Sequence, residues 1–122
     1  MHQLKKILPI SLLITLFAGA AYGWGAISVD DGEGFAPSEV GYGIVTSIPT
    51  KSAAELEALK ACRAEGNQNC LLALTFEKCG AYAASQLAYG AAAATTLKAA
   101  EENALSDCGD KECKIVISDC GE

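Results

Sequence analysis

The sequence predicts a single small, disulfide-rich domain of the α+β class, built from an antiparallel sheet and two helices. Three observations predict it. The chain has 122 residues, which fits one domain. It has six cysteines, an even number that is typical of a disulfide framework. Patterns typical of strand, strand, helix and strand follow one another twice, which indicates an internal duplication.

The N-terminus, residues 1–23, is predicted to be a secretory signal peptide. Lys5 and Lys6 form a short positive region, an apolar run follows at residues 7–17, and mostly small residues follow at 18–23. The apolar run is shorter than the roughly 20 residues of a membrane span. We therefore expect a periplasmic or secreted protein with no stable membrane anchor after cleavage.

Removal of that segment changes the charge and the available chemistry. Residues 24–122 keep all fifteen acidic residues and seven of the nine basic ones, so the formal net charge falls from −6 to −8. His2 is the only histidine and is lost with the signal. Its loss excludes catalytic triads and zinc sites that need an imidazole. The acidic balance argues against nucleic acid and anionic lipid as partners.

The first repeat unit is predicted at about residues 24–79. Residues 25–30 and 40–47 have strand patterns, and the pair Asp31-Gly32 between them is a turn signal. Residues 52–55 (SAAE) match a capping box at the start of a helix. The unit closes with an apolar strand at 70–76.

Helical spacing selects a core face for this first helix. Leu56, Leu59 and Cys62 recur at that spacing, so we expect them to face the core, and Gly66 marks the end of the helix.

The second unit is predicted at about residues 80–122 and repeats this order. Residues 80–83 echo the first strand, and residues 88–90 echo the Tyr-Gly of the second. Residues 91–94 are all alanine and fit either a helix or the end of a strand. A helix with Leu97, Leu105, Cys108 and Ala100 or Ala104 on one face is expected to end at Gly109, before a last strand at 113–118.

The repeat also predicts how the cysteines pair. We expect three disulfides, because a signal peptide indicates an oxidising compartment and no C-x-x-C motif supports a zinc ribbon or a redox site. One cysteine of each unit lies near the end of its helix and another opens the following strand. Of fifteen possible connectivities, proximity and pseudo-symmetry therefore favour Cys62–Cys70, Cys108–Cys113 and Cys79–Cys120.

The acidic residues are candidate metal ligands or catalysts. The loop Asp30-Asp31-Gly32-Glu33-Gly34 could bind calcium, but it lacks the EF-hand spacing, and a hairpin turn at Asp-Gly is the simpler interpretation. A hydrolase would need two carboxyl groups facing each other across a cleft, and no spacing selects such a pair. We therefore predict no catalytic residue, no metal site and no cofactor.

Four aromatic residues are the candidate binding surface: Trp24, Tyr42, Tyr82 and Tyr89. Aromatic side chains beside glycine in strands can present flat surfaces to a glycan or a protein. They can equally fill a small core, and large aromatic residues are mostly buried.

Several segments of the chain, some of which contain these aromatic residues, resemble a bacterial secreted family known as a domain of unknown function. The matching segments are WGAISVD at 24–30, GYG at 41–43, LKAC at 59–62, NC at 69–70 and CGAYA at 79–83. Tyr89-Gly90-Ala91-Ala92 departs from the family, which often has alternating Trp and Gly there. The resemblance implies an exported, non-catalytic module and no catalytic residues.

Together these observations predict a binding or accessory module of the bacterial envelope with a protein partner, for example one that stabilises a pilus or another envelope assembly. Three alternatives stay open. The protein could inhibit a toxin or a wall-active enzyme, it could be a small carboxylate-dependent hydrolase, or it could be a secreted effector or antigen that acts beyond the cell.

Overall fold

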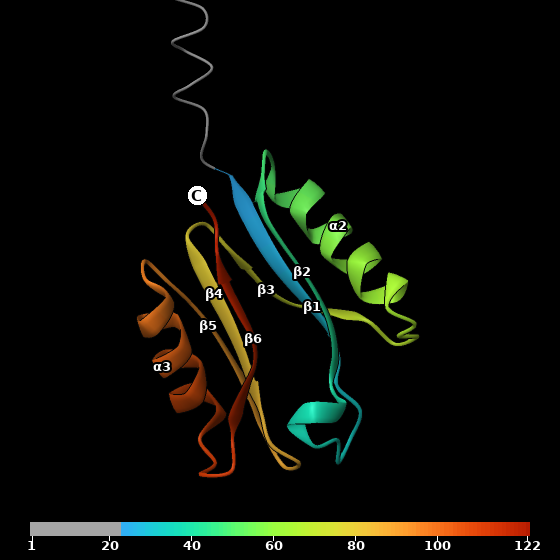
Figure 1. Ribbon diagram of the computed structural model, residues 1–122, viewed down its shortest axis with the longest axis vertical. Coiled ribbons are helices and arrows are strands. Elements are labelled where there is room, and N and C mark those ends of the chain that lie inside the picture. The colour runs from blue at the N-terminus through green and yellow to red at the C-terminus, as the bar shows by residue number, and fades with distance from the viewer. Residues whose placement is uncertain (1–22) are drawn as a thin grey trace, which may run out of the picture.

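The computed structural model describes residues 23–122, so the predicted signal peptide lies outside the described residues except for Gly23 (Figure 1). The elements are β1 (Trp24–Asp30), the 3-10 helix η1 (Pro37–Glu39), β2 (Gly41–Ile48), α2 (Lys51–Ala64), β3 (Leu71–Phe76), β4 (Cys79–Ala84), β5 (Tyr89–Ala94), α3 (Leu97–Cys108) and β6 (Lys114–Cys120). The α+β class with two helices is confirmed, and residues 91–94 belong to a strand.

The strands form two antiparallel sheets of three strands each, a division that the sequence did not indicate. The first has the order β2-β1-β3 and the second the order β5-β4-β6. The sheets pack face to face, α2 covers the outer face of the first and α3 the outer face of the second (Figure 1). Both halves therefore have the same topology, while their origin by duplication stays a prediction.

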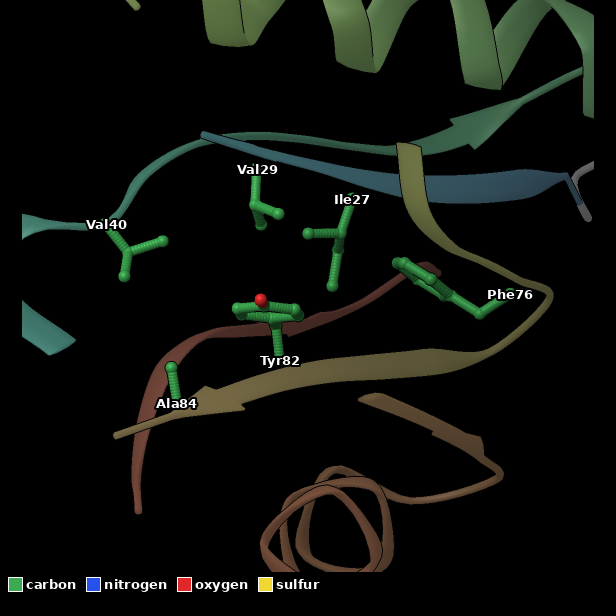
Figure 2. Packing of buried hydrophobic residues seen from close by; sticks show 6 residues of the cluster. All are labelled: Ile27, Val29, Val40, Phe76, Tyr82 and Ala84. Carbon is green, nitrogen blue, oxygen red and sulfur yellow. The ribbon is translucent and has the colours of Figure 1, made fainter. Parts of the chain in front are cut away.

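The main core lies between the two sheets. Ile27 and Val29 point from β1 toward Tyr82 and Ala84 of β4, and Phe76 closes one end of the cluster (Figure 2). Burying each large apolar side chain stabilises the fold by about 1.5–3 kcal/mol. Because side chains alternate along a strand, the residues between these positions face the helices instead.

Small residues fill the two interfaces between sheet and helix. Ala26 packs against Ala54 and Ala58 of α2. At Gly43 of β2, an added Cβ would lie 2.3 Å from the backbone nitrogen of Cys62, so this strand touches the helix backbone itself. Only glycine permits that approach.

The core face predicted for the first helix is therefore correct at Cys62 and wrong at Leu56. Ala54, Ala58 and Cys62 are buried, whereas Leu56 is exposed and Leu59 is only partly buried. A sheet that brings glycine to the helix leaves room for alanine and not for leucine.

The face predicted for α3 is correct at Ala100, Ala104 and Cys108, which are buried, and wrong at Leu97, which is exposed. Leu105, also predicted on that face, is partly buried. A Cβ added at Gly90 would lie 2.3 Å from the backbone nitrogen of Cys108, which matches the contact of Gly43 in the first half.

Both helices begin with a threonine cap. The Oγ1 atom of Thr50 accepts a hydrogen bond from the backbone N–H of Ala53, and Thr96 does the same for Ala99. The predicted capping box at residues 52–55 is wrong, because the helix already begins at Lys51. Gly109 adopts the left-handed conformation at the end of α3, as expected.

The three disulfides are those favoured by the sequence: Cys62–Cys70, Cys79–Cys120 and Cys108–Cys113. The first and third each join the end of a helix to the segment before the next strand of the same half. Cys79–Cys120 lies within the second sheet, where the two residues are paired across β4 and β6.

The connection between β1 and β2 contains a short helix, η1, that the sequence did not indicate. It runs from residue 31 to residue 40, and it is held in part by a hydrogen bond from the backbone N–H of Phe35 to the carbonyl of Gly32. The corresponding connection between β4 and β5 has only residues 85–88.

Candidate functional site: the β3–β5 groove

The four predicted aromatic residues do not form one surface. Trp24 packs beside α2, where the Nζ atom of Lys51 lies 5.9 Å from its ring centroid. Tyr42 is partly exposed on β2. Tyr82 is buried in the core, and Tyr89 stacks on it with 6.1 Å between ring centroids. Only Tyr82 and Tyr89 are brought together.

The Tyr82–Tyr89 pair lines a groove of about 730 Å³ at the side of the molecule where β3 lies against β5. We call it the β3–β5 groove. Its walls are residues 71–74 of β3, Tyr89 and Ala91 of β5, and the beginning of the β1–β2 connection. Its lining is completed by Val29, Asp30, Phe35, Asn69, Tyr82 and Asp107.

Exposed apolar side chains gather at this groove. Leu71 is 72% exposed, Tyr89 is 69% exposed and Leu72 is 40% exposed. Leu87, which is 90% exposed, lines an adjoining hollow together with Tyr89. Isolated exposed apolar residues are ordinary, but a contiguous group beside a groove is typical of an interaction site.

Leu71 and Leu72 were not among the predicted binding residues. Residues 71–76 (LLALTF) are almost entirely apolar, and the sequence predicts only an apolar strand there. A usable signal lay in the other half, because the repeat places Lys114 at the position of Leu71. A lysine there indicates that this position faces solvent.

Three aspartates edge the groove, and each accepts a hydrogen bond. Asp30 accepts from the backbone N–H of Asn69 at 3.2 Å, and Asp107 accepts from the backbone N–H of Ala91 at 3.1 Å. Asp31 accepts from the hydroxyl of Tyr82 at 2.6 Å. No lysine or arginine is among the residues that line the groove.

Through these hydrogen bonds the three aspartates stabilise the fold. The Tyr82–Asp31 bond ties the β1–β2 connection to the second sheet across the core. Burial, and next the hydrogen bond to Asp31, raise the pKa of the Tyr82 hydroxyl well above its usual range. Tyr82 is therefore a neutral hydrogen-bond donor at physiological pH.

The acidic loop at residues 30–34 does not gather into a metal site. Within residues 23–122, no group of three or more potential metal-binding side chains is found. In the same part of the chain no helix is both long and apolar enough to cross a membrane.

Residues 24–120 match the family described as "Domain of unknown function (DUF4189)". Two mycobacterial proteins are similar to part of the chain: Protein Rv1269c of Mycobacterium tuberculosis and Protein Mb1300c of Mycobacterium bovis, each 41% identical over 61 residues. The matched segment is 50% of this chain and 47% of each relative, so the chain spans about half the length of these curated relatives. No solved structure matches significantly.

Proposed function

Because the chain belongs to the DUF4189 family, which has no described activity, we propose a function from its geometry: it is a non-catalytic binding module that holds a protein partner in the β3–β5 groove. The proposal rests on one observation: Leu71, Leu72 and Tyr89 are all exposed and all line this groove. Covering them would remove apolar surface from water at a gain of roughly 25 cal/mol per Å².

The chemistry of the groove favours binding over catalysis. The carboxylates of Asp30, Asp31 and Asp107 already accept hydrogen bonds from the protein. Residues 24–122 contain no histidine to act as a general base. A surface of exposed apolar residues with a polar edge is instead the usual anatomy of a protein interface.

We place the module outside the cytoplasm, in the periplasm or beyond it, with its partner in the bacterial envelope. Three disulfides in so small a domain support an oxidising compartment. The predicted signal peptide at residues 1–23 agrees with this location.

Site-specific photo-crosslinking in the native host tests the proposal. A photoreactive phenylalanine analogue replaces Tyr89 in one variant and Leu56 in a control, because Leu56 is exposed on α2, away from the groove. We expect a discrete crosslinked protein from position 89 and none from position 56. Equal crosslinking at both positions, or none at position 89, would contradict the proposal.

A further inference from the structure

The two halves of the fold differ in one respect that identifies the occupant of the groove. We propose that the β3–β5 groove takes a short polypeptide segment of a protein partner, apolar with at least one basic side chain, in the place that residues 37–40 fill on the other half. This inference rests on the proposed function and specifies its ligand.

Strand register makes β3 and β6 equivalent. In the first half, Leu71 pairs with Val29 and Leu72 with Ser28 of the central strand β1. In the second half, Lys114 pairs with Ala84 and Ile115 with Ala83 of the central strand β4. Each pairing has a register shift at the same place, after Ile27 in β1 and after Tyr82 in β4. Leu71 therefore corresponds to Lys114, and Leu72 to Ile115.

The opposite strands correspond as well. Gly43 of β2 and Gly90 of β5 each lie against the backbone of their helix at the same distance. Tyr42 and Tyr89 each come one residue before these glycines, so they correspond to each other. The groove between β3 and β5 is therefore the counterpart of the surface between β6 and β2 on the other side of the molecule.

On that other side the chain covers its own surface. The β1–β2 connection is ten residues long, and η1 within it lies against β6. Pro37, Ser38 and Val40 line a small hollow together with Ile115 and Val116. Val40 is buried there in the main core.

The second half has no such cover. The β4–β5 connection has only four residues and is closed by a 2.8 Å hydrogen bond from the backbone N–H of Ser85 to the carbonyl of Ala88. It does not contribute to the lining of the β3–β5 groove. Tyr89 is consequently 69% exposed, whereas its counterpart Tyr42 is 39% exposed.

The comparison points to a polypeptide because a polypeptide already fills the equivalent place. The covering segment Pro37–Val40 is one turn of 3-10 helix that begins with proline and ends with a buried valine. A partner segment of similar size, with aliphatic side chains toward Leu71 and Leu72, would complete the groove in the same way.

Charge selects among such segments. Asp30, Asp31 and Asp107 edge the groove without a lysine or arginine in its lining, and residues 24–122 carry a net charge of −8. A basic side chain in the partner complements this edge, and an acidic one is repelled. Lys114, the counterpart of Leu71, pairs with β4 in the sheet, which shows that this position of the strand accepts a charged side chain.

Two matched libraries of short synthetic peptides test the inference in solution. Both vary alanine, valine, leucine, isoleucine and proline, and one carries lysine where the other carries glutamate. We expect fluorescence anisotropy to show saturable binding of lysine peptides to the full domain, weakening as salt is raised. Leu71→Lys should weaken this binding roughly tenfold or more, and Asp107→Asn about two- to fivefold. Leu56→Lys and Glu57→Gln on α2 are the controls and should bind as the unaltered protein does.

Each contrary result has its own meaning. Equal binding of the lysine and glutamate libraries, or no binding of either, would overturn the inference, and the proposed function would survive if crosslinks still form at position 89. Self-association of the domain that disappears in the Leu71→Lys variant would overturn the inference too, because the occupant of the groove would then be a second copy of this chain. Binding to uncharged lipid vesicles in place of peptides would also overturn it. Absence of crosslinks at position 89 would remove the proposed function itself.

Discussion

At the scale of single residues, the fold depends on small side chains at fixed positions. Glycine and alanine let each helix approach its sheet, and one buried serine departs from this pattern. The Oγ atom of Ser28 is fully buried and, among the described residues, has no hydrogen-bond partner. Its counterpart by strand register is Ala83, which is also fully buried.

Ser28→Ala is therefore expected to keep or increase stability. It removes an unsatisfied hydroxyl whose burial costs about 1–3 kcal/mol, and the second half shows that alanine fits. Urea unfolding at neutral pH measures the effect. The control is Ser85→Ala, which loses three hydrogen bonds, to Asp110, Leu87 and Ala88, and should destabilise the domain. If Ser28→Ala lowers stability as much as Ser85→Ala, the hydroxyl has a partner that this account lacks.

Gly43→Ala and Gly90→Ala should each destabilise the domain by about 3 kcal/mol or more. The new Cβ would lie 2.3 Å from a helix backbone nitrogen in both cases, so the helix must shift outward. Gly34→Ala is the comparison, since nothing lies within 4 Å of its Cβ position and only its positive φ, costing about 1–2 kcal/mol, opposes the change. Thermal unfolding of the three variants gives the order of their stabilities. Equal losses of stability would contradict the close contacts at Gly43 and Gly90.

The burial of Tyr82 is expected to make the stability of the domain depend on pH. Its pKa is raised in the folded protein, so above about pH 10 the unfolded chain loses a proton that the folded chain keeps. Stability from this group is complete below that pH and falls as pH rises further. Tyr82→Phe should flatten the fall measured by urea unfolding in alkaline buffers, and Tyr42→Phe should not. An unchanged slope in Tyr82→Phe would contradict the burial of this hydroxyl together with its bond to Asp31.

At the scale of elements, the order strand, strand, helix and strand in each half was predictable, as were the disulfide pairs. Turn signals, helix ends and cysteine positions are local, and local patterns locate elements well. The core-facing side of α2 was not predictable, because Leu56 has the more apolar side chain and only the sheet geometry at Gly43 favours Ala54 and Ala58. The long β1–β2 connection followed from the predicted strands at 25–30 and 40–47, but η1 within it did not.

Loop length predicts how much each disulfide stabilises the domain. Cys79–Cys120 spans 41 residues, Cys62–Cys70 spans 8 and Cys108–Cys113 spans 5. Because each disulfide restricts the unfolded chain, the expected stabilisation is about 4, 2.5 and 2 kcal/mol in that order. Replacing each pair by alanine and measuring urea unfolding tests the ranking. A greater loss from the Cys108–Cys113 pair than from Cys79–Cys120 would show that something other than loop entropy decides.

At the scale of the whole molecule, the two similar halves differ in how an outer strand of each sheet is covered. The chain covers β6 with its own residues 37–40 and leaves β3 uncovered, because the β4–β5 connection is only four residues long. The sequence alone could not show this, since it requires knowing that β3 faces β5 across two sheets. Of the four aromatic residues proposed as a binding surface, Tyr82 and Tyr89 line the groove, and Trp24 lies beside α2.

The central claim is that a partner binds in the β3–β5 groove. Its most direct test is a map of amide chemical shifts in the isotope-labelled domain, recorded while the partner recovered by crosslinking is added. The account predicts that the changes concentrate on residues 71–74, 89–91 and 30–35, and that Leu71→Lys abolishes them. Changes concentrated on the exposed faces of α2 and α3, with the groove residues unaffected, would contradict it.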